Sequence, residues 1–124
     1  MKKNPLEILN CIAQVIYDKK GKNILALDVQ GLSSITDYLV IAEGNVDRHV
    51  IAIAKAVIDE LQKQGIRDLR VEGLSIGDWV VVDLHGIMVH LFMPGIREKY
   101  SLEKLWAESQ IVDLQIHIST MNLS

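Results

Sequence analysis

The chain has 124 residues and a mass of 13.9 kDa, the size of one domain, and it carries a net charge of −3. Hydrophobic residues make up 49% and charged residues 23%, a balance that excludes an intrinsically disordered chain. The acidic charge argues against direct, specific binding of nucleic acid, and no apolar run approaches the roughly 20 residues that span a bilayer. Because Cys11 is the one cysteine, no internal disulfide can form, and we expect a cytoplasmic domain without a membrane partner.

A helix is predicted at the N-terminal end of the chain. Asn4 can cap its first turn, and Pro5 suits the first helical position, where a backbone N–H would have no intrahelical partner. Apolar residues then recur every three or four positions, which is typical of an amphipathic helix. The segment from Lys19 to Gly21 supplies the cations and the glycine that commonly end a helix.

Short apolar runs and turn residues predict the elements that follow. Gly65 ends the longest helix, His85-Gly86 forms a tight turn, and Pro94 stands where a further element can begin. In chain order, the predicted elements are strands at 23–29 and 38–42, a helix at 46–64, strands at 68–72, 79–84 and 87–92, and a last helix at 102–109.

These elements predict the fold class. The order α-β-β-α-β-β-β-α indicates an α/β protein, bordering on α+β, with a mixed β-sheet of about five strands flanked by helices. Residues 1–107 form the expected single domain, and residues 108–124 form a C-terminal tail. Weakly alternating apolar residues predict that the tail is either an edge strand or a mobile end.

The sequence has no strong signature of an enzyme active site. The four histidines do not stand at zinc-ligand spacing, no nucleophile elbow occurs, and no glycine-rich phosphate-binding motif can be found. Cys11 lies beside Ile12 and Val15 on the apolar side of the first helix, which favours a small buried hydrophobe over a reactive thiol. We therefore expect no catalytic residue, no metal site and no cofactor.

One segment, Gly31 to Leu39, has the look of a nucleotidyltransferase, in which a Gly-Ser turn precedes a strand with two metal-binding carboxylates. Asp37 could supply one carboxylate, but Leu39 stands where the second is needed. Asp37 and Asp83 alone would hold a metal weakly at best. The segment predicts a nucleotidyltransferase-like fold without the metal-binding carboxylate pair. A nucleotide-binding protein or a vestigial nucleotidyltransferase is an alternative function.

A set of short motifs in a fixed order carries a more specific resemblance. The motifs are Asp18-Lys19-Lys20, Asp37-Tyr38 with Val40-Ile41, Trp79-Val80 with Asp83, Val89-His90 with Phe92, and Tyr100-Ser101-Leu102-Glu103-Lys104-Leu105-Trp106. Together they resemble the ribosomal silencing factor family (RsfS, also called Iojap or YbeB-like) over about Leu6 to Ala107. After Asp83 the family usually has an aromatic residue and then a glycine. Here Leu84 and His85 precede Gly86, so we expect a locally altered hairpin.

The resemblance implies a translation regulator that is not an enzyme. Members of the family bind the large ribosomal subunit through ribosomal protein number fourteen and sterically block its association with the small subunit, which lowers translation when nutrients are scarce. The resemblance also implies a nucleotidyltransferase-like fold without the chemistry, and a homodimer when the protein is free. A dimeric scaffold with a non-ribosomal partner is a further alternative.

The candidate partner-binding residues are aromatic and apolar anchors with charged neighbours, a combination that protein interfaces favour. The anchors are Trp79, Phe92, Tyr100, Leu105 and Trp106, the acidic groups that can pair with a basic ribosomal protein are Asp78, Asp83 and Glu103, and His90 stands among the anchors. Each residue also has a structural interpretation. The anchors can pack an element onto the sheet, His90 can satisfy a core hydrogen bond, and the carboxylates can be solvated surface charges.

Overall fold

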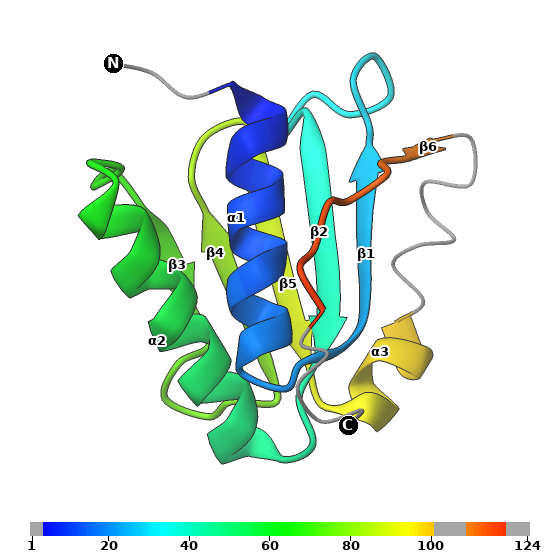
Figure 1. The fold of residues 1–124 in the computed structure, drawn as a ribbon. Helices are drawn as coiled ribbons and strands as arrows, with labels where there is room; N and C mark the ends of the chain where they lie inside the picture. Colours follow the sequence, from blue (N-terminus) through cyan, green and yellow to red (C-terminus); the bar gives the residue numbers. More distant parts are fainter. Residues whose placement is uncertain (1–3, 101–108, 119–124) are drawn as a thin grey trace.

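The computed structural model describes residues 4–100 and 109–118, and for residues 98–100 it describes the backbone alone. Helices and strands follow one another in the described residues much as the sequence predicts (Figure 1). In chain order they are α1 (Pro5–Asp18), β1 (Lys22–Asp28), β2 (Tyr38–Glu43), α2 (Asp47–Lys63), β3 (Arg70–Glu72), β4 (Trp79–Asp83), β5 (Ile87–Phe92), α3 (Pro94–Tyr100) and β6 (Gln110–Ile111).

The strands form one mixed sheet in the order β3-β4-β5-β2-β1-β6. Strands β2 and β5 run parallel in its centre, and the other neighbours are antiparallel. The α/β fold class with a mixed sheet and flanking helices is therefore confirmed. The sheet has six strands, where the sequence predicts about five, because two residues of the tail add β6 at the edge beside β1.

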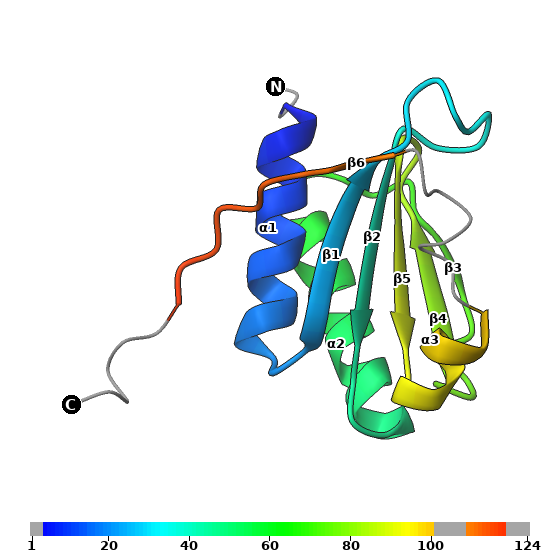
Figure 2. The same cartoon turned by 90° about the vertical axis from the view of Figure 1, so that its right-hand side faces the viewer.

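Helices cover both faces of the sheet unequally. Helices α1 and α2 lie side by side on one face (Figure 1), whereas α3 lies on the other (Figure 2). Strand residues alternate between the faces, so that Val80 and Val82 of β4 belong to the core beneath α1 and α2. Trp79 packs on the opposite face with Phe92 of β5 and Ile96 of α3.

Local chemistry explains where several elements begin and end. The Asn4 side chain accepts a hydrogen bond from the Leu6 backbone N–H at 2.8 Å and caps α1, and Pro5 occupies its first turn as predicted. The predicted tight turn is also confirmed, because Leu84 N–H donates to the Ile87 carbonyl at 3.0 Å across His85 and Gly86. Both turn residues have positive φ angles, 60° and 105°, which is the conformation of a type I′ hairpin turn.

The region after β5 matches the sequence-based expectation in part. Pro94 begins α3, as expected of a proline at an element start. The helix predicted at 102–109 lies outside the described residues, apart from Ser109, which forms a bend. In the part of the chain that is described, no helix has the length and hydropathy needed to cross a bilayer.

Candidate partner-binding surface

Three of the predicted site residues come together on the sheet face that carries α3. The register of the β4–β5 hairpin places Trp79 opposite Phe92 and Val81 opposite His90. The Trp79 and Phe92 ring centroids are 5.1 Å apart, and His90 lies 5.9 Å from Trp79 and 6.0 Å from Phe92. The sequence motifs W-V-x-x-D and V-H-x-F thus meet as one aromatic cluster, formed by Trp79, His90 and Phe92.

The three rings of this aromatic cluster differ in exposure. Phe92 is fully buried, His90 is 8% exposed, and Trp79 is half-buried. Trp79 is therefore the ring of this cluster that presents surface to solvent, while Phe92 and His90 support it from beneath. Large, partly exposed aromatic side chains of this kind are common interface anchors.

His90 accepts a hydrogen bond from Trp79, since the indole N–H can only donate. The Trp79 Nε1 to His90 Nδ1 distance is 3.0 Å, so the neutral imidazole carries its proton on Nε2. Desolvation by burial lowers the pKa of His90 from 6.5 to about 4. The ring is consequently neutral at physiological pH, and it orients the Trp79 indole.

The lowered pKa of His90 predicts a loss of stability in acid. His90 binds a proton near pH 6.5 in the unfolded chain but only near pH 4 in the folded chain. Its contribution to stability therefore decreases as the pH falls from 6.5 and levels off below pH 4. This difference amounts to about 3 kcal/mol of unfolding free energy between pH 7 and pH 4. Urea unfolding at the two pH values should show this loss in the natural chain. Between pH 7 and pH 4, a His90→Gln variant should lose about 3 kcal/mol less unfolding free energy than the natural chain. Equal losses in the two proteins would contradict the lowered pKa of His90.

A shallow depression of about 380 Å³ lies beside Trp79. It is lined by Glu72, Gly73, Asp78, Trp79, Val81 and Ile96. Two carboxylates thus flank a half-buried indole, an arrangement suited to a partner with basic and apolar groups. The sequence indicated Asp78 and Trp79, whereas Glu72, Val81 and Ile96 emerge from the structure. Val81 could have been found from the two-residue period of β4.

Gly73 shapes the depression because its backbone approaches that of Trp79 closely. Its φ angle is +90°, a conformation that residues other than glycine rarely adopt. A Cβ atom at this position would collide with the Trp79 carbonyl oxygen. Any larger residue would therefore displace the strand end that carries the indole.

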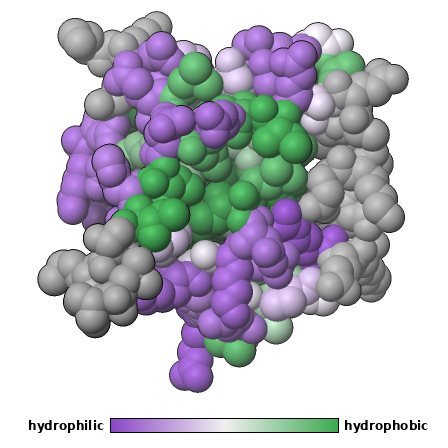
Figure 3. All heavy atoms as spheres, turned by 45° about the vertical axis from the view of Figure 1, so that its right-hand side comes forward, coloured by the Kyte–Doolittle hydropathy of each residue, from purple (hydrophilic) through white to green (hydrophobic). Residues whose placement is uncertain are grey.

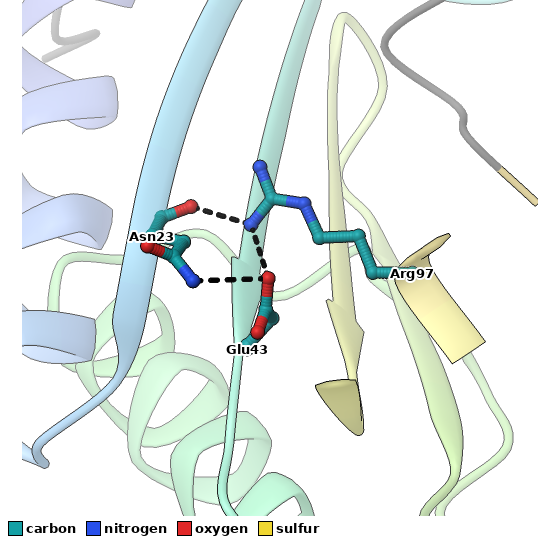
Figure 4. Close-up of polar contacts among 3 residues, drawn as sticks. All are labelled: Asn23, Glu43 and Arg97. Atoms are coloured by element: carbon teal, nitrogen blue, oxygen red, sulfur yellow. Dashed lines mark hydrogen bonds and ion pairs between the residues drawn. The ribbon is translucent and has the colours of Figure 1, made fainter. Parts of the chain in front are cut away.

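A buried ion pair attaches α3 to the sheet (Figure 4). Arg97 of α3 donates from Nη1 to Oε2 of Glu43 at 3.0 Å and to the backbone carbonyl of Asn23 at 2.6 Å. The Asn23 side chain donates to the same carboxylate oxygen at 3.2 Å. The Arg97 and Glu43 side chains are only 10% and 13% exposed. This Arg97–Glu43–Asn23 cluster fixes α3, and with it Ile96, next to Trp79.

Among the other predicted site residues that the structure describes, Asp83 lies away from the aromatic cluster. It is four residues from Trp79 along β4, roughly 13 Å in an extended strand. Its Oδ1 accepts the His85 backbone N–H at 3.0 Å and stabilises the hairpin turn. Tyr100 ends α3, but its side chain is not described, and Glu103, Leu105 and Trp106 lie outside the described residues.

The structure also places the residues considered for chemistry. Asp37 lines a pocket of about 410 Å³ at the start of β2, and Asp83 is not among the residues that line it. Within residues 4–100 and 109–118, no group of three His, Cys, Asp or Glu residues could hold a metal ion. Cys11 is half-buried, and its Sγ lies 2.8 Å from Gln64 Nε2, so the expectation of a plain buried hydrophobe was incomplete.

These features define an α/β protein with a mixed sheet, whose candidate site is an aromatic and acidic surface beside α3. Comparison with known proteins identifies it further: residues 2–122 match the family described as ribosomal silencing factor during starvation. The chain belongs to this ribosomal silencing factor family (RsfS), which confirms the resemblance seen in its motifs.

Individual relatives agree with this assignment. The chain is 40% identical over 111 residues to the Bacillus subtilis ribosomal silencing factor RsfS, covering 90% of this chain and 94% of that protein. A crystal structure of a Chromobacterium violaceum protein superposes with a TM-score of 0.82 at 32% identity, covering 93% and 95% of the two chains. A mouse protein named mitochondrial assembly of ribosomal large subunit protein 1 is 27% identical over 118 residues, covering 93% of this chain and 52% of the mouse protein.

Proposed function

We propose that this protein represses translation by binding the large ribosomal subunit through ribosomal protein number fourteen and blocking association with the small subunit. Membership of the ribosomal silencing factor family carries this proposal. The name of the mouse relative, which refers to the large subunit, is consistent with it. The protein would act in the cytoplasm, by occlusion and without catalysis.

The depression beside Trp79 suggests how the contact is made. The exposed part of the Trp79 indole would pack against an apolar part of the partner. Glu72 and Asp78, at the rim of the depression, would pair with basic side chains of the partner. We propose as further contact residues the other members of the predicted set, Asp83, His90, Phe92, Tyr100, Glu103, Leu105 and Trp106, with His90 and Phe92 acting by supporting Trp79. The free protein is proposed to be a homodimer.

Co-sedimentation with isolated ribosomal particles tests the proposed function. The purified protein should pellet with large subunits and not with small subunits. It should also lower the fraction of joined ribosomes when the small subunits are added afterwards. Failure to pellet with any particle would contradict large-subunit binding, and pelleting without an effect on joining would contradict occlusion.

A further inference from the structure

Residues 110–118 run from the β1 edge of the sheet across α1, on the face of the sheet away from α3 (Figure 2). Just after β6, the Val112 N–H donates a backbone hydrogen bond to the Ala26 carbonyl of β1 at 2.8 Å. Further along, two side chains of α1, Asn10 and Gln14, contact the segment. Because these two residues are four positions apart, they lie on the same side of the helix.

The bonds to α1 involve backbone groups of the tail. Asn10 Oδ1 accepts the Gln115 N–H at 2.8 Å. The Gln14 carboxamide accepts the His117 N–H at 2.7 Å and donates to the His117 carbonyl at 3.1 Å. Gln14 thus pairs with residue 117 as a peptide group of a neighbouring strand would, and Asn10 engages the residue two positions earlier. The Asp18 carboxylate accepts a second bond from Gln14, at 2.9 Å, and so orients its amide.

Side chains of the tail alternate between the core and solvent. Val112 and Leu114 pack against the core beneath α1 and Ile116 is half-buried, whereas residues 111, 113, 115 and 117 are exposed. The alternation ends at Ile118, which is 67% exposed. Figure 3 shows a continuous hydrophobic area on the side of the molecule that carries α1, β1 and this segment. The surface of α1 and β1 that holds the tail therefore combines apolar contacts at alternate tail positions with hydrogen bonds to the tail backbone.

We propose that Asn10, Gln14 and the β1 edge form a binding site for an extended peptide, which residues 112–118 of the chain itself occupy and which a partner segment can take over. A suitable partner segment has apolar residues at alternate positions and free N–H groups where Gln115 and His117 lie, so it has no proline there. Hydrogen bonds to backbone groups supply affinity without demanding a particular sequence, as in strand addition to a sheet edge. The site lies across the sheet from Trp79, so both surfaces can be engaged together.

The site is tested on the full chain, with the tail displaced by substitution. Leu114→Asp should release the tail by placing a carboxylate against the core, and a fluorescein-labelled peptide of residues 110–118 should then bind. Measured by fluorescence anisotropy, the peptide should bind this variant at least tenfold more tightly than the natural chain. Adding Asn10→Ala and Gln14→Ala should remove at least tenfold of that affinity. Ile118→Asp, at an exposed position of the same segment, should behave like the natural chain.

Equal peptide binding by the natural chain and by a folded Leu114→Asp variant, checked by circular dichroism, would overturn the proposal. Amide hydrogen exchange of the natural chain gives an independent test if that variant does not fold. The Gln115 and His117 amides should exchange at least tenfold faster than those of β2 and β5, because the tail opens without global unfolding. Exchange of these two amides only together with the central strands would show that the tail cannot be replaced.

Discussion

An Arg97→Ala variant should lose about 3–5 kcal/mol of unfolding free energy, because it leaves the buried Glu43 carboxylate without its charged partner. The guanidinium also donates to the Asn23 carbonyl, which would lose that hydrogen bond. Equilibrium unfolding in urea measures the change directly. The expected loss is a large share of the stability of a typical domain, so the measurement should begin at low temperature and low denaturant.

The chain offers a matched control for this ion pair. Lys63 and Asp59 lie 3.4 Å apart on α2, but their side chains are 69% and 67% exposed. Lys63→Ala should therefore change the unfolding free energy by no more than about 0.5 kcal/mol. If Arg97→Ala proved as mild as Lys63→Ala, the Arg97–Glu43–Asn23 cluster would not hold α3 in the way the structure suggests.

Features set by neighbouring residues could be predicted from the sequence. Pro5 and Asn4 define the start of α1, and His85-Gly86 defines the β4–β5 turn, because each depends on backbone chemistry within a few residues. Counting back along both strands from that two-residue turn pairs Trp79 with Phe92. The aromatic cluster was therefore implicit in the sequence once the turn was placed.

Features that depend on distant residues could not be predicted in this way. Arg97 and Glu43 are 54 positions apart, and nothing in their local sequence indicates that they meet. The parallel pairing of β2 with β5 likewise depends on how the whole chain packs. Full burial of Phe92 beside a half-buried Trp79 follows from the position of α3 over the sheet. For this reason the sequence predicts both Trp79 and Phe92 as anchors but does not distinguish the exposed ring from the buried one.

The tail illustrates the same limit at the edge of the sheet. Its alternating residues were compatible with an edge strand or a mobile end. In the structure, β6 comprises only Gln110 and Ile111, and the hydrogen bonds beyond Val112 come from α1 side chains. Periodicity describes how a strand presents its side chains, but it does not show which groups bind the backbone.

A Trp79→Ala variant should bind large ribosomal subunits at least 30-fold more weakly than the natural protein, if the proposed function holds. Truncating a central aromatic anchor typically costs 2 kcal/mol or more of binding free energy, and 1.4 kcal/mol corresponds to a factor of ten. Quantitative co-sedimentation over a range of subunit concentrations measures the change. Circular dichroism should confirm that the variant is folded, since the indole also donates to His90.

Two further variants separate the indole surface from its hydrogen bond and from the charges around it. Trp79→Phe retains a ring but cannot donate to His90, so it should recover most of the lost affinity if apolar contact dominates. Glu72→Gln combined with Asp78→Asn removes the acidic rim, which should slow association and weaken its dependence on salt more than it changes dissociation. Normal binding by a folded Trp79→Ala variant would place the contact surface elsewhere on the protein, even if family membership correctly identifies the partner.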